Sequence, residues 1–211
     1  MKRIIGIYLA AGKSKRMGMC KLSLPLSLPL SVKPLGTIAL AEIMKSNIDH
    51  LLIVTNDIKA SWLNSADVLR TYSTKWENVI SLQSHLGQSY SLRTGIRRAV
   101  QLGAESVIVF LADQPFVRTC MINRLINEAE SEYAYVASSD GEIIKPPIIF
   151  HKKAFKELIA INGDKGARGL LKNGALKGMS IAMSSEHLFD IDTIEEYEYA
   201  KTFINSIRSF S

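Results

Sequence analysis

Short apolar runs recur along the first half of the chain. Ile4 to Leu9 is an almost continuous apolar run that leads into a glycine-containing loop, and similar runs stand at Leu51 to Thr55 and Ser106 to Leu111. Strands that are apolar on both faces are typical of parallel sheets with helices on both sides. The three runs therefore predict buried strands of one sheet.

Helical periodicity lies between and after these strands. The spacing i, i+3, i+4, i+7, i+8 gives an apolar face to Leu92, Gly95, Ile96, Ala99 and Val100. The same pattern is repeated by Ile122, Leu125, Ile126 and Ala129. Alternating strands and helices predict βαβ units with right-handed crossovers, and hence an α/β fold around a mostly parallel sheet.

The pattern is looser after about Tyr133. Tyr133 to Ser138 and Pro146 to Phe150 are predicted as strands, and the helical spacing of Ala154 to Ile159 predicts a short helix. Thr193 to Ser206 is predicted to close the chain as a helix, because Thr193-Ile194-Glu195-Glu196 has the form of a capping box.

No linker or internal repeat divides the sequence, so a single domain over residues 1–211 is expected. The stretch Leu22 to Pro34 contains three prolines and shows no apolar periodicity. It is predicted to be an extended surface loop.

Composition and charge narrow the class of partner. With 26 basic and 20 acidic residues the net charge is +6, which favours polyanionic ligands. The basic residues are scattered and do not interleave with aromatic residues, so nucleic acid is not expected as a partner. Two cysteines and four dispersed histidines indicate neither a zinc site nor a disulfide framework.

Membrane association is not expected either. No apolar stretch approaches the roughly 20 residues that a spanning helix needs. The short apolar run after Met1 continues into the basic glycine loop without a signal-peptide cleavage pattern. A cytoplasmic location is therefore expected.

A basic, glycine-containing loop, here named the first loop, follows the first predicted strand. It reads Leu9-Ala10-Ala11-Gly12-Lys13-Ser14-Lys15-Arg16-Met17-Gly18, and Lys21 is close behind. Small residues let the backbone approach an anion, and basic side chains surround it, which favours a phosphate cradle. A glycine turn with solvated lysines is the alternative. The loop matches neither the P-loop nor the Gly-x-Gly-x-x-Gly pattern.

A carboxylate ends the third predicted strand, in Leu111-Ala112-Asp113-Gln114-Pro115. In doubly wound sheets ligands bind beyond the carboxyl ends of the strands. Asp113 is therefore well placed to hold Mg²⁺ against phosphates in the first loop. A turn-capping role is the alternative for Asp113 taken alone.

Taken together, five motifs in order resemble the MobA-like NTP transferases, and the resemblance spans nearly the whole chain. Besides the first loop and the Asp-Gln-Pro turn, the motifs are Ser89 to Gly95, Gly163 to Arg168 and Asp190 to Thr193. The resemblance is strongest to the molybdenum cofactor cytidylyltransferase branch. It implies a three-layer, Rossmann-like fold of the nucleotide-diphospho-sugar transferase type. It also implies transfer of CMP or GMP to the terminal phosphate of molybdopterin with release of pyrophosphate.

The resemblance also implies roles on the nucleotide side. The nucleotide would be held by Leu9, Ala10, Ala11, Gly12 and Lys13 in the first loop, with Ser89 and Ser91 at the base. Helix N-capping is the alternative for the two serines. Arg16 and Lys21 would hold the phosphates and offset the negative charge of the transition state. The sequence Leu-Ala-Ala-Gly is typical of the cytidylyl branch and favours CTP as the donor.

Further roles follow for the metal and the acceptor. Asp113 and Asp192 would bind Mg²⁺, and Asp164 and Arg168 would bind the acceptor, with Arg168 suited to a bidentate phosphate contact. A helix start with a surface arginine is the alternative for that motif. Because the acceptor phosphate is already an anionic nucleophile, no strong general base is needed.

Three functional hypotheses stay open at this stage. The leading one is a molybdopterin cytidylyltransferase, with a molybdenum hydroxylase as a transient partner. The second is a transferase of the same fold with another reaction: a GTP-dependent molybdopterin guanylyltransferase, or an enzyme for a sugar phosphate or a phospholactate-type acceptor. The third is a non-catalytic nucleotide- or cofactor-binding maturation factor for a molybdenum hydroxylase. Lys145-Pro146-Pro147 departs from the family's frequent Gly-His-Pro, so the acceptor pocket is where a difference is expected.

Overall fold

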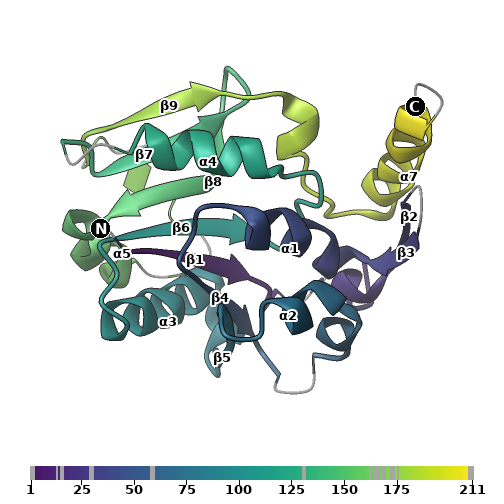
Figure 1. Ribbon diagram of the computed structural model, residues 1–211, viewed down its shortest axis with the longest axis horizontal. Coiled ribbons are helices and arrows are strands. Elements are labelled where there is room, and N and C mark those ends of the chain that lie inside the picture. Colours follow the sequence, from purple (N-terminus) through teal and green to yellow (C-terminus); the bar gives the residue numbers. More distant parts are fainter. Residues whose placement is uncertain are drawn as a thin grey trace.

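A central seven-stranded sheet organises the computed structural model (Figure 1). The model describes residues 3–12, 14, 17–28, 31–57, 60–129, 132–161, 163, 167, 170–171, 174 and 176–208, with the backbone alone for 205–208. In spatial order the strands are β5 (Trp76–Ile80), β4 (His50–Thr55), β1 (Ile4–Leu9), β6 (Ser106–Leu111), β8 (Ile144–His151), β7 (Tyr135–Ser139) and β9 (Gly178–Ala182). Among these described strands, β8 alone runs antiparallel to its neighbours.

Helices cover both faces of the sheet. They are α1 (Leu35–Lys45), α2 (Asp67–Thr71), α3 (Gln88–Gln101), α4 (Thr119–Asn127), α5 (Phe155–Ala160) and α7 (Ile194–Arg208). Short 3₁₀ turns are η1 (Lys21–Ser23), η2 (Ser61–Ser65), η3 (Ser84–Leu86), η4 (Lys152–Ala154) and η5 (Ser185–Leu188). No helix in the described ranges is both long and apolar enough to cross a bilayer.

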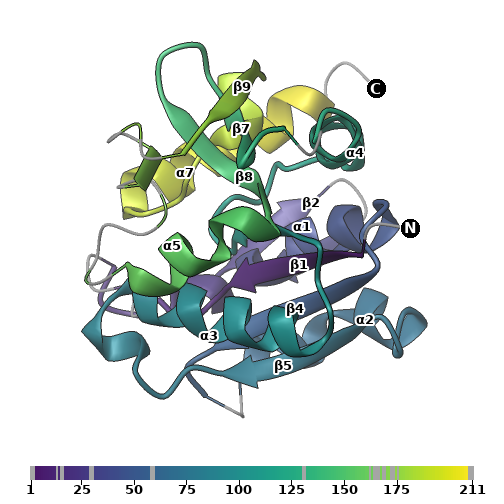
Figure 2. The same cartoon turned by 90° about the vertical axis from the view of Figure 1, so that its left-hand side faces the viewer.

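Two hydrophobic cores lie on opposite faces of the sheet. Successive strand residues point to opposite faces, so Tyr8 packs into the core beneath α1, α2 and α4, whereas Ile7 packs beneath α3 and α5. Figure 2 shows α3 and α5 together on one side of the strands. The predicted three-layer α/β architecture with a mostly parallel sheet is confirmed.

The predicted strands agree closely with the observed ones. β1 and β6 have the predicted bounds, and β4 begins one residue earlier than expected. The predicted apolar face of α3 is buried except for Val100, which is 49% exposed. Eight residues at 100° each place Val100 about 80° from Leu92, at the margin of the stripe that faces the sheet.

The prediction of a surface loop from Leu22 to Pro34 is wrong. The segment forms η1 and then an antiparallel hairpin of β2 (Pro25–Leu28) and β3 (Ser31–Pro34). Pro25 and Pro34 stand at the first and last hairpin positions, where a missing N–H is tolerated. Leu26 is fully buried in a third core with Ile191 and Tyr197, and the Tyr197 hydroxyl donates a hydrogen bond to the Pro25 carbonyl.

The hairpin and α7 therefore form one unit beside the carboxyl ends of β1 and β6 (Figure 1). Phe116, which follows β6, belongs to the same core and packs edge-on against Phe203 of α7. This third core brings the segment after Ile191 to the edge of the sheet where the first loop begins.

Close packing of α3 sets its distance from the sheet. A Cβ atom on Gly95 would lie 2.6 Å from Cγ2 of Ile7 and 3.2 Å from Cγ2 of Val54. The glycine therefore lets the helix lie directly on β1 and β4, with its N-terminus beside the loop that follows β1.

We expect Gly95→Val to lower the free energy of unfolding by about 3 kcal/mol, because the added carbons overlap the β1 and β4 side chains. Urea denaturation measures the change. The control Val100→Ala, at an exposed position of the same helix, should stay within about 0.5 kcal/mol of the unmodified protein. A Gly95→Val protein of unchanged stability would contradict this packing.

Candidate active site

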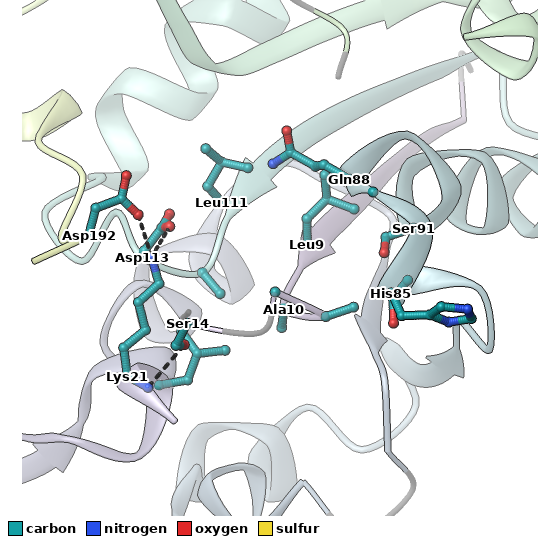
Figure 3. Close-up of a pocket in the computed structure, with 16 residues that line it drawn as sticks. Leu9, Ala10, Ser14, Lys21, His85, Gln88, Ser91, Leu111, Asp113 and Asp192 are labelled. Carbon is teal, nitrogen blue, oxygen red and sulfur yellow. Dashed lines mark hydrogen bonds and ion pairs between the residues drawn. The ribbon is translucent and has the colours of Figure 1, made fainter. Parts of the chain in front are cut away.

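A cavity of about 360 Å³ opens at the carboxyl ends of β1 and β6 (Figure 3). The first loop contributes its floor through Ala10, Ala11, Gly12 and Ser14. The segment from η3 into α3 forms one wall, and Lys21, Asp113 and Asp192 form the other. Its volume is in the range of small-molecule sites, roughly 300–1,000 Å³.

Parallel strand pairing places the first loop next to Asp113. Leu9 and Leu111 are register partners in β1 and β6, so both strands end at the same edge of the sheet. The Ala112 N–H donates to the Leu9 carbonyl at 3.2 Å, and the Ala10 N–H donates to the Val54 carbonyl at 2.9 Å. These bonds fix the backbone on both sides of the cavity floor.

Lys21 joins the two acidic residues that were predicted to bind metal. Its Nζ atom lies 2.6 Å from Oδ2 of Asp113 and 2.7 Å from Oδ1 of Asp192, and it donates a third hydrogen bond to the Ile191 carbonyl at 2.9 Å. Lys21 is only 8% exposed. Residues 92 and 171 positions away in sequence thus converge on one buried cation.

Backbone contacts hold the two carboxylates in place. The Ile191 N–H donates to the Asp113 carbonyl at 3.0 Å, which ties the turn after β6 to the segment before α7. Oε2 of Glu196 accepts hydrogen bonds from the N–H groups of Asp192 and Thr193 at 2.7 and 2.8 Å. The Glu196 N–H in turn donates to Oγ1 of Thr193 at 3.2 Å. The predicted capping box is confirmed, and it also fixes the backbone of Asp192.

Charge balance in the site favours the protonated lysine. Burial alone would lower the pKa of Lys21, but the charge of Asp113 and the hydrogen bonds to Asp113 and Asp192 outweigh it and raise the pKa.

Burial, aided by the Asp113 charge, also raises the pKa of the Tyr8 hydroxyl. That hydroxyl donates to the Gly36 carbonyl at 2.9 Å and so links β1 to the start of α1.

The structure brings most of the predicted site residues together. One cavity is lined by Leu9, Ala10, Ala11, Gly12, Lys21, Ser91, Asp113 and Asp192. Lys13, Arg16, Asp164 and Arg168 lie outside the described residues. The two predicted base contacts differ in position, because Ser91 lines the cavity and Ser89 does not.

Ser89 is fully buried in the first turn of α3. Its hydroxyl has no hydrogen-bond partner within the described part of the chain, and its N–H donates to the Gly163 carbonyl at 3.3 Å. The alternative of side-chain N-capping is not observed, because Gly87 is the N-cap residue and no side-chain cap bond is formed.

Sequence reasoning missed the wall formed by Ser84, His85, Gly87 and Gln88. Figure 3 shows His85, Gln88 and Ser91 across the cavity from Lys21 and Asp113. The preceding strand β5 could have revealed this wall, but its mixed Trp76-Glu77-Asn78 start lacks the apolar pattern of β1, β4 and β6. Finding β5 would have marked these residues as a loop at the carboxyl end of a strand.

Asp113 and Asp192 fit a divalent metal that is shared with phosphates. The ammonium of Lys21 already shows that their oxygens converge on a cation. Oδ1 of Asp113 is buried and makes no hydrogen bond within the described residues. Across the described part of the chain, no cluster of three or more His, Cys, Asp or Glu side chains is suited to a metal. Mg²⁺ is commonly held by one or two carboxylates with substrate phosphates, so two are sufficient here.

We expect Glu196→Ala to lower the free energy of unfolding by about 1–2 kcal/mol, because two N–H groups lose their acceptor. Glu196→Gln keeps an oxygen acceptor and should recover most of that loss. Glu195→Ala, at the neighbouring exposed position, is the matched control and should change stability by less than about 1 kcal/mol. Urea denaturation of the three variants measures this, and equal effects of Glu196→Ala and Glu195→Ala would contradict the capping role.

Comparison with known proteins gives a relative that spans nearly the whole chain. The chain is 35% identical over 202 residues to the purine catabolism protein PucB of Bacillus subtilis (strain 168), a match that covers 94% of this chain and 96% of the relative.

Solved structures share the fold at lower identity. The Rv0371c homologue from Mycobacterium sp. strain JC1 aligns with a TM-score of 0.79 at 22% identity, over 98% of this chain and 100% of that chain. Rv0371c of Mycobacterium tuberculosis H37Rv in complex with manganese has a TM-score of 0.73 at 24% identity, over 95% and 99%. The molybdopterin-guanine dinucleotide biosynthesis protein A of Archaeoglobus fulgidus has a TM-score of 0.68 at 17% identity, over 96% and 99%.

These likenesses show the fold of the nucleotide-diphospho-sugar transferases. The MobA-like NTP transferase domain itself matches residues 6–179, which include most of β1, the first loop, Asp113 and most of the sheet. Together with the strand arrangement and the cavity at the carboxyl ends of β1 and β6, this match shows that the chain belongs to the MobA-like NTP transferase family, a family of nucleotidyltransferases.

Proposed function

We propose that this nucleotidyltransferase joins CMP from CTP to the terminal phosphate of molybdopterin, with release of pyrophosphate. The single observation that carries the proposal is the convergence of Asp113 and Asp192 on one cation beside the first loop. Two carboxylates around a cation, next to a glycine-containing loop in an open cavity, are what a metal–triphosphate complex requires.

The first loop is assigned to the triphosphate. Its small residues Ala10 to Gly12 line the cavity. The Ala10 N–H is bonded to the Val54 carbonyl, so the N–H groups that follow it in the loop are the ones assigned to the phosphate oxygens. Lys21, together with Arg16 outside the described residues, supplies positive charge for the phosphates. Such preorganised charge is the main contribution that a protein makes to nucleotidyl transfer.

The reaction is an exchange of one P–O bond for another. An oxygen of the acceptor phosphate forms a bond to the α-phosphorus of CTP, and the bond from that phosphorus to the oxygen bridging to the β-phosphorus breaks, so that pyrophosphate carries away the negative charge. Asp113 and Asp192 would hold a divalent ion, with Mg²⁺ proposed, which supplies neutralising charge to the phosphates. Support for a divalent ion comes from the manganese complex of the related fold in Rv0371c.

The wall across the cavity from Lys21 is assigned to the base. Ser91 and Gln88 offer hydroxyl and amide groups there, and these groups can hydrogen-bond to the polar edge of a nucleobase. His85 also lines the cavity, but its Nδ1 atom lies 3.2 Å from the Leu82 carbonyl. CTP is favoured over GTP by the Leu-Ala-Ala-Gly sequence of the first loop. A guanylyl transferase is the alternative within the same cavity.

Molybdopterin is proposed as the acceptor on two grounds. One neighbour of the same fold is described as a molybdopterin-guanine dinucleotide biosynthesis protein, and the 35% identical relative is described as a purine catabolism protein. A cofactor delivered to a molybdenum hydroxylase of purine breakdown would reconcile the two descriptions. Such a hydroxylase is accordingly the proposed transient partner.

We expect purified protein with Mg²⁺ and molybdopterin to release pyrophosphate from CTP. Asp113→Asn or Asp192→Asn should lower kcat by at least about 100-fold, because each removes a principal electrostatic contact. Asp67→Asn, the same chemical change at an exposed carboxylate of α2, is the control and should leave kcat unchanged.

Other outcomes of this experiment would replace the proposal. Pyrophosphate release from GTP alone would show a guanylyltransferase, and release only with a sugar phosphate or a phospholactate would show another acceptor class. Tight CTP binding without pyrophosphate from any acceptor would favour the non-catalytic maturation factor.

A further inference from the structure

We propose that Lys21 and the divalent metal occupy the same place in turn: metal binding to Asp113 and Asp192 displaces the Lys21 ammonium, which then becomes available to the triphosphate. The inference rests on the proposed function, because it concerns the same cavity and the same two carboxylates. It adds an order of events and a linkage between metal and nucleotide that the proposed reaction does not require.

Hydrogen-bond capacity is the first argument. A lysine ammonium has three N–H donors and no acceptor. The three acceptors of Lys21 are Asp113, Asp192 and the Ile191 carbonyl, at 2.6, 2.7 and 2.9 Å. No donor is left for a phosphate oxygen in this arrangement. Lys21 can therefore hold the phosphates only after it leaves the carboxylates.

Space and charge give the second argument. Mg²⁺ binds carboxylate oxygens at about 2.0–2.1 Å. An ion bound to Oδ2 of Asp113 and Oδ1 of Asp192 would lie where the Lys21 Nζ atom lies, because the ammonium contacts the same two oxygens. Two cations cannot share that point. Oδ1 of Asp113 is buried and makes no hydrogen bond within the described residues, so this carboxylate has acceptor capacity that the lysine does not use.

The position of the Lys21 backbone gives the third argument. The Lys21 N–H donates to Oγ of Ser14 at 3.2 Å, so the side chain starts beside the first loop. Figure 3 shows its stem running along the cavity wall from that loop toward Asp113. Its flexible four-carbon stem allows the ammonium to turn from the carboxylates toward the loop without backbone movement.

Two consequences follow from this exchange. Without the metal, Lys21 offsets part of the repulsion between two carboxylates in a partly buried site. With the metal, the released ammonium adds a positive charge to the phosphate site. Metal and triphosphate therefore favour each other's binding, and the linkage is reciprocal.

Mn²⁺ binding in the absence of nucleotide tests the exchange directly. The free Mn²⁺ signal in electron paramagnetic resonance gives the dissociation constant for the unmodified protein, Lys21→Met and Lys75→Met. We expect Lys21→Met to bind Mn²⁺ about tenfold more tightly or better, because the ion no longer competes with charge-assisted hydrogen bonds. Lys75→Met removes the same charge from a lysine that donates to the Met44 and Ser46 carbonyls, and it should bind Mn²⁺ as the unmodified protein does. Equal or weaker Mn²⁺ binding by Lys21→Met would overturn the proposal.

A second measurement needs no variant and covers the case in which Lys21→Met does not fold. Acetylation of lysines in the unmodified protein, followed by peptide mass spectrometry, reports how accessible each ammonium group is. Saturating Mn²⁺ should raise the labelling rate of Lys21 several-fold and leave that of Lys75 unchanged. An unchanged Lys21 rate at saturating Mn²⁺ would overturn the exchange.

The two proposals fail in different ways. If no NTP gives pyrophosphate but Mn²⁺ still raises Lys21 labelling, the proposed function fails and the exchange stands. If pyrophosphate is released but the Mn²⁺ affinity of Lys21→Met does not exceed that of the unmodified protein, the exchange fails and the proposed function stands.

Discussion

The pairing of Asp113 and Asp192 with the same buried ammonium group, that of Lys21, is the interaction on which the rest of the site depends. Partly buried carboxylates are costly unless they are paired, and two of them close together also repel each other. Here the one ammonium of Lys21 donates to both, with hydrogen bonds of 2.6 and 2.7 Å, and so reduces their repulsion. Since the three residues come from η1, from the turn after β6 and from the segment before α7, this one contact ties distant parts of the chain to the same edge of the sheet.

The supporting structure is arranged around that contact. Parallel pairing of β1 with β6 sets the first loop beside Asp113, and the third core packs α7 onto the β2–β3 hairpin close to Asp192. The Glu196 cap then fixes the Asp192 backbone. Packing and capping thus determine how closely the carboxylates approach, and the charges determine what can occupy the space between them.

The buried strands of the sheet and much of the site could be predicted from the sequence, for identifiable reasons. Buried strands such as Ile4–Leu9 are apolar at nearly every position, which a pattern of single residues can reveal. Asp113 was found because it follows such a strand directly. The capping box of α7 was found because Thr193 and Glu196 interact over a few residues, as the structure confirms.

What could not be predicted depends on contacts distant in sequence. The β2–β3 hairpin has no strand pattern in the sequence because its prolines hide the pairing, and Leu26 is buried through packing in the third core, which includes α7. The contact of Lys21 with both carboxylates joins residues 92 and 171 positions apart, and no local pattern contains it. Ser84, His85 and Gln88 were missed because β5 lacks an apolar run.

A crystal structure with a non-hydrolysable CTP analogue and Mn²⁺ tests the central claim most directly. We expect an anomalous Mn²⁺ peak between Asp113 and Asp192, the triphosphate against the Ala10 to Gly12 backbone, and the Lys21 Nζ atom on a phosphate oxygen. A Mn²⁺ peak away from both carboxylates, with Lys21 still bonded to them and the nucleotide elsewhere, would contradict it.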